Sequence, residues 1–141
     1  MAECVFCDIL AGTKPASVVY RDQQCVAFMD VRPVNPGHVL VIPVQHAPGL
    51  AELDPEAGAQ MMRVAQRIAR ALRSSNLRCE GVNLHLADGA AAGQEVFHVH
   101  LHVVPRFRSD GFGLRFGPNY GQLAARSELD RVAASLRTLV G

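Results

Sequence analysis

The chain has little charge of either sign and no excess of one. Of its 141 residues, 14 are basic and 13 are acidic, so the formal net charge is +1 and only 19% of the residues are charged. A wide basic surface, which would hold a nucleic-acid backbone through counterion release, is therefore missing. We expect no nucleic acid among the partners of this protein.

Long apolar runs are missing as well. The first eight residues lack the basic and apolar parts of a secretory signal, and the most apolar later stretch, residues 39–44, is far shorter than the roughly 20 residues that cross a bilayer. We therefore expect a cytoplasmic protein with no membrane partner. In that compartment four cysteines are expected to be thiols or metal ligands rather than disulfides: Cys4, Cys7, Cys25 and Cys79.

The patterns that are present indicate an α+β protein. A length of 141 residues fits one domain, and 49% hydrophobic content supplies one core. Apolar alternation or β-branched runs predict five strands, at residues 18–20, 25–29, 38–44, 82–87 and 97–104. Because several of these segments are separated only by turns, an antiparallel sheet is favoured over parallel crossovers.

Two amphipathic helices are expected beside this sheet. Asp54 followed by Pro55 is typical of a helix start, and apolar residues then recur at three- and four-residue spacing to about Arg73. A closing helix is expected to reach Val140, after a stretch at residues 127–130 that resembles a capping sequence. We take residues 1–141 as a single domain in which 106–141 form a C-terminal extension with a helix.

Three of the six histidines lie within five residues, as His98-Val99-His100-Leu101-His102. Side chains alternate along a strand, so the three imidazoles are expected on one face, roughly 7 Å apart at Cβ. They could be a solvated strand face, metal ligands, or a nucleophile with an acidic or electrostatic partner. The clustering disfavours the first interpretation, and the other two are compatible if different histidines take different roles.

The N-terminal Cys4-x-x-Cys7 pattern is typical of half of a tetrahedral zinc site. Two further ligands would have to come from elsewhere in the chain. A thioredoxin-like redox role for this pair is the alternative. It is disfavoured because no predicted strand precedes the two cysteines.

Four ordered motifs run between Cys4 and about Arg106: Phe6-Cys7-Asp8-Ile9, Ala27-Phe28-Met29-Asp30, Pro36-Gly37-His38-Val39-Leu40-Val41-Ile42-Pro43 and Ala91-Ala92-Gly93-Gln94-Glu95-Val96-Phe97-His98-Val99-His100-Leu101-His102. Together they resemble the histidine triad (HIT) hydrolases, most closely the branch of histidine triad nucleotide-binding proteins and bacterial HIT proteins. The resemblance implies a HIT-like five-stranded antiparallel sheet with a long helix, usually paired about a two-fold axis. This fold agrees with the segments predicted above.

The resemblance implies that His100 is a nucleophile that attacks the α-phosphorus of a nucleoside monophosphate derivative. Water would then release the nucleotide from the histidine. His102 is implied to contact the phosphate and help the leaving group depart, and His98 to assist. The family's transferases and phosphorylases commonly have glutamine at the position of His102, so histidine favours hydrolysis. The expected substrates are purine nucleoside 5'-phosphoramidates or acyl adenylates, with dinucleoside polyphosphates as a second class.

The same resemblance implies a nucleotide site. An apolar slot for the purine is implied at Phe6, Ile9, Phe28 and Val31. Asp30 resembles the carboxylate that accepts hydrogen bonds from the ribose. Backbone amides for the phosphate oxygens are implied at Gly93, Gln94, Glu95 and Val96. Ala87 departs from the family, whose eukaryotic members have asparagine there, and Glu95 stands where they have serine.

The resemblance also implies a metal site and a dimer. Some bacterial members hold zinc through residues that match Cys4, Cys7, His46 and His98, and four protein ligands make such a site structural. No organic cofactor is implied. A two-fold homodimer is expected, since a lone antiparallel sheet leaves its edges open. His38 is expected to be a hydrogen-bonded strand histidine. A purine nucleotide sensor without turnover remains the alternative function.

Overall fold

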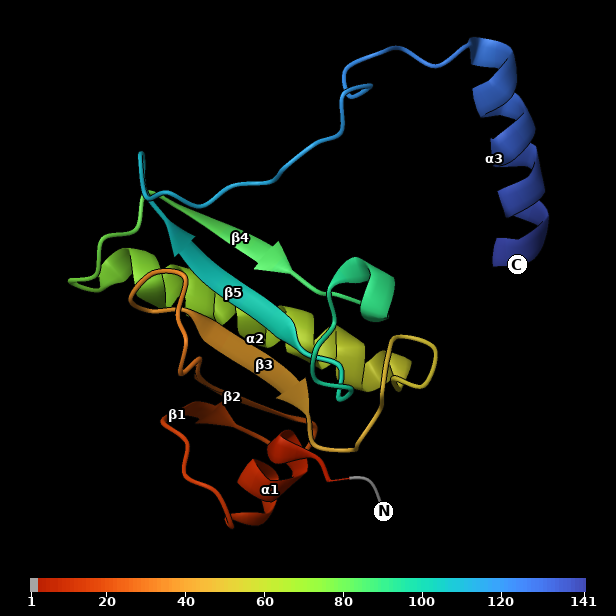
Figure 1. The fold of residues 1–141 in the computed structure, drawn as a ribbon. Coiled ribbons are helices and arrows are strands. Elements are labelled where there is room, and N and C mark those ends of the chain that lie inside the picture. Colours follow the sequence, from red (N-terminus) through yellow and green to blue (C-terminus); the bar gives the residue numbers. More distant parts are fainter. Residues whose placement is uncertain (1–2) are drawn as a thin grey trace. The chain divides into compact units, whose positions relative to one another are not determined.

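The computed structural model describes residues 3–141 (Figure 1). In chain order its elements are α1 (Val5–Ala11), β1 (Val18–Arg21), β2 (Cys25–Met29), β3 (Val39–Pro43), α2 (Pro55–Ser74), β4 (Gly81–His85), the 3₁₀ helix η1 (Ala90–Ala92), β5 (Leu101–Arg106) and α3 (Arg126–Val140). The chain divides into one compact unit that ends at Gly111 and a second unit, Phe112–Gly141.

The five strands form one antiparallel sheet in the order β1-β2-β3-β5-β4. The predicted α+β class with a five-stranded antiparallel sheet is confirmed. β5 lies between β3 and β4, and the register sets His102 opposite both Leu40 and His85. The last triad histidine is therefore held between two neighbouring strands.

The sheet is covered on both faces, by α2 on one face and by α1 on the other. One face packs Ala27, Val41 and Val103 against apolar residues of α2, which runs along the sheet in Figure 1. The other face packs Phe28 and Leu40, with Val26 and Ile42, against Phe6 of α1. Because both faces are buried, β2 and β3 are continuous apolar runs rather than alternating ones.

The start of α2 is the predicted one. Asp54 accepts a hydrogen bond from the backbone N–H of Glu56 at 3.4 Å, and Pro55 occupies the first turn, where no N–H partner is needed. The helix ends at Ser74, one residue beyond the prediction.

The largest differences from the sequence prediction are at α1 and β5, while β4 ends at His85 rather than at the predicted residue 87. The structure adds α1, whose N-cap is the Cys4 thiol accepting from Cys7 N–H at 3.4 Å, and which ends at Gly12 with a φ of 80°. β5 begins at Leu101 rather than Phe97, because the segment before it bonds elsewhere: Val99 N–H donates to the carbonyl of Ala47 at 2.8 Å. His98 and His100 therefore precede the strand instead of sharing its face.

The second unit contains α3, which matches the predicted closing helix except at its start. Its N-cap is Ala125, without a side-chain hydrogen bond, so the predicted capping sequence does not cap it. No residue of α3 is buried, although its apolar side chains include Leu129, Val132 and Leu136. Among residues 3–141 there is no helix with the length and apolar character needed to cross a membrane.

Candidate active site

The three triad histidines lie together at the start of β5, with decreasing burial along the chain. His98 is fully buried, His100 is 8% exposed and His102 is half-buried. The ring centroids of His100 and His102 are 5.0 Å apart, and the ring of Phe6 is in T-shaped contact with both His98 and His100. α1 therefore packs directly on the predicted catalytic residues.

The hydrogen bond at Nδ1 of His100 determines which of its nitrogens can react. Nδ1 lies 2.8 Å from the backbone carbonyl of His98. A carbonyl only accepts, so Nδ1 must carry the proton, and in the neutral ring Nε2 keeps its lone pair. The structure thus holds His100 in the tautomer that a nucleophilic Nε2 requires.

Both ring nitrogens of His98 are engaged in a different way. Nε2 donates to the carbonyl of Pro43 at 2.9 Å, which leaves Nδ1 with its lone pair pointing at a cluster of sulfur and nitrogen atoms. Burial lowers the pKa of His98. The backbone carbonyl of His98 therefore bonds to His100, while the ring of His98 belongs to the cluster of sulfur and nitrogen atoms.

Four residues of that cluster match the predicted metal ligands: Cys4, Cys7, His46 and His98. The sulfur-to-nitrogen distances are 3.5 Å for Cys4 to His98, 3.4 Å for Cys7 to His46 and 3.6 Å for Cys7 to His98, and the two Nδ1 atoms are 3.1 Å apart. A zinc tetrahedron has S···N edges of about 3.5 Å and N···N edges of about 3.3 Å, given its usual bond lengths. The donor set therefore fits a structural zinc ion.

His102 has a further histidine as its neighbour. Its Nδ1 lies 2.9 Å from Nε2 of His38, whose own Nδ1 accepts from the backbone N–H of Val34 at 3.1 Å. Burial lowers the pKa of His38, and burial followed by the charges of neighbouring histidines lowers the pKa of His102 to about 4. The sequence did not predict this pair, and His38 just before the buried β3 was the only local signal.

The loop before the triad is built by a buried glutamine. The side chain of Gln94 accepts from Gly89 N–H at 2.7 Å and donates to the carbonyls of Pro48 and Val96. The backbone N–H groups of Gly93 and Gln94 donate within the turn, to the carbonyls of Ala90 and Gly89. Of the four loop residues predicted to bind phosphate, Glu95 and Val96 are the two whose N–H groups have no acceptor within residues 3–141.

The residues predicted for the purine slot divide into two groups. Phe6 and Phe28 are buried core residues, against which Ile9 and Val96 pack. Val31, in contrast, is 88% exposed and lies outside that cluster. The carboxylate of Asp30 accepts from Arg32 N–H at 2.9 Å and lies 3.5 Å from Nε2 of His38.

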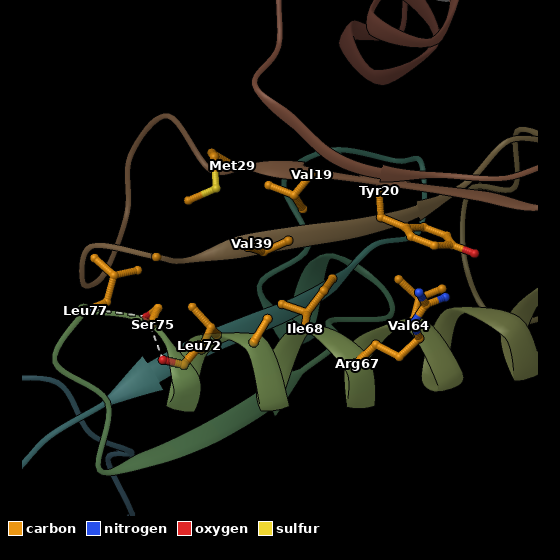
Figure 2. A pocket seen from close by; sticks show the side chains of 12 residues that line it. Val19, Tyr20, Met29, Val39, Val64, Arg67, Ile68, Leu72, Ser75 and Leu77 are labelled. Carbon is orange, nitrogen blue, oxygen red and sulfur yellow. Dashed lines mark hydrogen bonds between the residues drawn. The ribbon is translucent and has the colours of Figure 1, made fainter.

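A separate apolar cavity of about 380 Å³ lies between α2 and strands β1 to β3 (Figure 2). Its lining includes Val19, Val39 and Ile68, and Arg67 lies over the ring of Tyr20 at one end. None of the predicted catalytic, nucleotide-binding or metal residues lines it. The cavity is on the α2 face of the sheet and is distinct from the histidine site.

The chain belongs to the HIT family, since the HIT domain matches residues 11–109. An uncharacterized HIT-like protein of Borreliella burgdorferi is 42% identical over 118 residues, which cover 83% of this chain and 85% of that protein. Adenylylsulfatase HINT3 of Arabidopsis thaliana is 38% identical over 108 residues, 77% of this chain and 54% of the plant protein. The predicted resemblance is confirmed.

Solved structures agree with this family and its fold. A HIT family protein from Bacillus anthracis has a TM-score of 0.90 and 34% identity, covering 99% of this chain and 98% of that one. A zinc-bound histidine triad family protein from Mycobacterium smegmatis has a TM-score of 0.76 and 44% identity, covering 97% and 95%. The chain is thus similar to a protein that binds zinc, and its own Cys and His cluster has a donor set suited to that metal.

Proposed function

We propose that this protein is a nucleotide hydrolase that cleaves purine nucleoside 5'-phosphoramidates or acyl adenylates through a nucleotidyl intermediate on His100. The observation that carries the proposal is the 2.8 Å hydrogen bond between His100 Nδ1 and the carbonyl of His98. It fixes Nε2 as the unprotonated nitrogen of the neutral ring. The position of His100, 8% exposed and only four residues after Val96 in the chain, suits attack on a bound phosphate.

The reaction follows in two displacements. Nε2 of His100 forms a bond to the α-phosphorus, and the bond from phosphorus to the leaving group breaks. An acyl group leaves as a carboxylate, whereas an amine leaves with the bonding electrons and a proton from solvent. Water then forms a bond to phosphorus, the phosphorus–Nε2 bond breaks, and a proton passes to solvent as His100 regains its lone pair.

The other predicted residues support this chemistry by binding. The free N–H groups of Glu95 and Val96 are available to phosphate oxygens, where they would stabilise developing charge. Asp30 would accept from the ribose, and the apolar cluster at Phe6 and Phe28 would lie beneath the purine. HIT family members are generally nucleotide hydrolases, and the plant relative is named for an adenylyl substrate. Dinucleoside polyphosphates are the second substrate class.

A structural zinc ion is part of the proposal. Cys4, Cys7, His46 and His98 would hold it, and the ion would act by tying the N-terminus to the two segments that carry the histidines. The site touches the nucleophile through His98, whose carbonyl orients His100. We expect no organic cofactor.

A cytoplasmic homodimer is the proposed form of the molecule. The four cysteines form no disulfide within residues 3–141, as expected in a reducing compartment. β4 is an edge strand with Leu84 exposed, and the second unit carries apolar side chains but no buried residue. A second copy of the chain would cover these surfaces. With a net charge of +1, we expect no nucleic acid as partner.

Intact-protein mass spectrometry after a rapid acid quench tests the function. With an adenosine phosphoramidate, the wild-type protein should gain the mass of one adenylyl group, and peptide mapping should locate it on His100. His100→Ala should lower kcat by about 10³-fold or more and leave nucleotide affinity largely unchanged, because binding uses other residues.

Two results would contradict the proposal. One is near wild-type hydrolysis by His100→Ala. The other is an unmodified protein that retains AMP but releases none from AMP-lysine, which would favour the sensing function. A panel of phosphoramidates, acyl adenylates and dinucleoside polyphosphates, each followed by AMP release, identifies the leaving group.

A further inference from the structure

His38, His102 and a backbone amide form a continuous chain of hydrogen bonds beside the nucleophile. Val34 N–H lies 3.1 Å from His38 Nδ1, and His38 Nε2 lies 2.9 Å from His102 Nδ1. His38 is 3% exposed, so water does not compete for its ring. Within residues 3–141 the ring of His102 makes this hydrogen bond and no other.

The direction of every bond in this chain follows from its first member. An amide N–H can only donate, so His38 Nδ1 accepts, and the proton of the neutral His38 ring must be on Nε2. His102 Nδ1, at 2.9 Å, is nearer to this Nε2–H than the Asp30 carboxylate at 3.5 Å, and two N–H groups cannot face each other at 2.9 Å, so Nδ1 of His102 is the acceptor. The proton of the neutral His102 ring is then on its own Nε2, which is left free to donate to a substrate.

Both rings are neutral near neutral pH, as this assignment requires. Burial is the main cause that lowers the pKa of each, and the pKa of His102 falls to about 4. The charged or titratable groups that face the pair are Asp30, His85 and His100. Asp30 raises the pKa of His38, but less than burial lowers it.

Asp30, His38 and His102 also come close enough to suggest a second metal site. The hydrogen-bond pattern argues against it. Nε2 of His38 would have to give a lone pair to the metal, yet Val34 N–H requires the proton to be on that nitrogen. The 2.9 Å separation between His38 and His102 is also shorter than the N···N edge of about 3.3 Å that zinc geometry gives, and it is typical of a hydrogen bond.

The amide that begins the chain is itself held in place. Asn35, next to Val34, is 5% exposed and donates to the carbonyl of Pro105 at 2.9 Å and to Asp110 at 2.8 Å. The N–H of His38 donates back to the carbonyl of Asn35 at 3.1 Å. The loop from Val34 to His38 is thus anchored to the far end of β5, the strand that carries His102.

We propose that His38 is a positioning residue for the reaction: with Val34 N–H it holds His102 in the tautomer that presents Nε2–H as a hydrogen-bond donor to the substrate. No proton is transferred along the chain, since a neutral His38 that gave up its Nε2 proton would become an anion. His102 therefore donates a hydrogen bond to the phosphate oxygen or the leaving-group atom. The catalytic consequence rests on the proposed function, whereas the tautomer does not.

Nitrogen NMR of the purified full-length protein decides the tautomer directly. In long-range ¹H–¹⁵N correlation spectra of ¹⁵N-labelled protein near neutral pH, His102 should show a protonated Nε2 and an unprotonated, hydrogen-bonded Nδ1. Loss of the resonances in His102→Gln gives the assignment. A proton on Nδ1 of His102, or rapid exchange between the two tautomers, would overturn the proposal whether or not the protein hydrolyses nucleotides.

Two variants of His38 then test the consequence for catalysis. His38→Leu removes the donor, and His38→Gln supplies an amide N–H in its place. His38→Leu should lower kcat about tenfold or more for an alkylamine phosphoramidate and less than about threefold for an activated aryl leaving group, with KM changed less than about threefold. His38→Gln should recover most of the loss and keep the His102 spectrum of the wild type.

A double variant separates positioning from a general loss of structure. In a His102→Gln background, His38→Leu should lower kcat no further, because the residue through which it acts is gone. Equal losses for both leaving groups, an additive effect in the double variant, or an active His38→Leu with wild-type kcat would each contradict the proposal. Absence of hydrolysis by the wild type would refute the proposed function and leave the NMR result standing.

Discussion

At the scale of single residues, the site contains three histidines whose rings are hydrogen-bonded in three different ways. In each triad histidine, one ring nitrogen is hydrogen-bonded to a different partner. This bond determines whether the other ring nitrogen carries a proton or a lone pair. The carbonyl of Pro43 leaves His98 a lone pair that faces the Cys and His cluster, the carbonyl of His98 leaves His100 a lone pair that would attack phosphorus in the proposed reaction, and His38 would leave His102 a donor. Residue identity alone does not distinguish these roles.

The lowered histidine pKa values predict how stability depends on pH. His102 has a folded-state pKa of about 4 against 6.5 for the free side chain, and His38 is shifted in the same direction. Between these values the unfolded chain binds protons that the folded protein does not. We therefore expect the contribution of these histidines to the free energy of unfolding to be constant above about pH 6.5 and to fall as the pH drops towards 4. Urea unfolding at several pH values measures it.

His102→Gln is the matched control for this pH dependence. The variant removes one titrating group and leaves the metal cluster intact, so its unfolding midpoint should fall less steeply with decreasing pH than that of the wild type. Equal slopes for the two proteins would show that burial does not lower the pKa of His102.

At the scale of elements, the site is assembled where two loops run side by side. The end of β3 and the segment after it accept hydrogen bonds from the segment before β5 at three carbonyls: Pro43 from His98, Ala47 from Val99 and Pro48 from Gln94. α1 closes the cluster with Cys4 and Cys7. Zinc would thus hold three segments that no regular sheet pairing connects.

Replacing the two cysteine ligands should abolish zinc binding, so that the metal no longer holds the three segments together. We expect about one zinc ion per chain in the purified protein and none in Cys4→Ser, Cys7→Ser, measured by elemental analysis. Burial, followed by the hydrogen bond with Cys4, raises the pKa of the Cys7 thiol, so zinc binding releases a proton there and should weaken in mild acid. The unfolding temperature should fall in the variant, since the metal binds the folded state.

A second double variant controls for general effects of removing thiols. Cys25→Ser, Cys79→Ser changes two cysteines outside the cluster and should retain the metal, although burial of Cys25 gives that variant its own cost in stability. Zinc retained undiminished in Cys4→Ser, Cys7→Ser would contradict the assigned ligands.

The elements also show how far the sequence could predict the structure. β2 and the start of α2 depend on local patterns, an apolar run and an Asp-Pro cap, and both were predicted at the observed residues. α1 has only seven residues, which are too few to show the apolar periodicity by which a helix is recognised in a sequence. Its N-cap is a cysteine. The start of β5 and the His38–His102 bond depend on partners 52 and 64 positions away, which no local pattern encodes.

At the scale of the whole molecule, the two units differ in whether they have a buried core. The first unit has a buried cluster on each face of its sheet. The second has 30 residues, and none of its residues is buried. A segment of this size without a core does not keep its structure alone in water. Its exposed side chains therefore need a surface to cover them.

A second copy of the chain is the partner that we predict for this surface. Light scattering at micromolar concentration should give twice the chain mass of 15.2 kDa. Leu129 and Leu136, seven residues apart on α3, are 43% and 54% exposed and lie on one helical face. Burying a leucine contributes about 1.5–3 kcal/mol, so Leu129→Glu, Leu136→Glu should shift the protein to the monomer.

Ser135→Glu on the same helix is the matched control, because it adds charge at a polar position and should leave the dimer intact. Zinc content should be unchanged in all three proteins if the first unit folds independently of pairing, whereas the monomeric variant should lose helical circular dichroism because α3 would no longer be covered. A wild-type protein that scatters light as a 15.2 kDa monomer would contradict the dimer. A Leu129→Glu, Leu136→Glu variant that remains dimeric would instead assign the pairing to surfaces other than this face of α3, such as the exposed edge of β4.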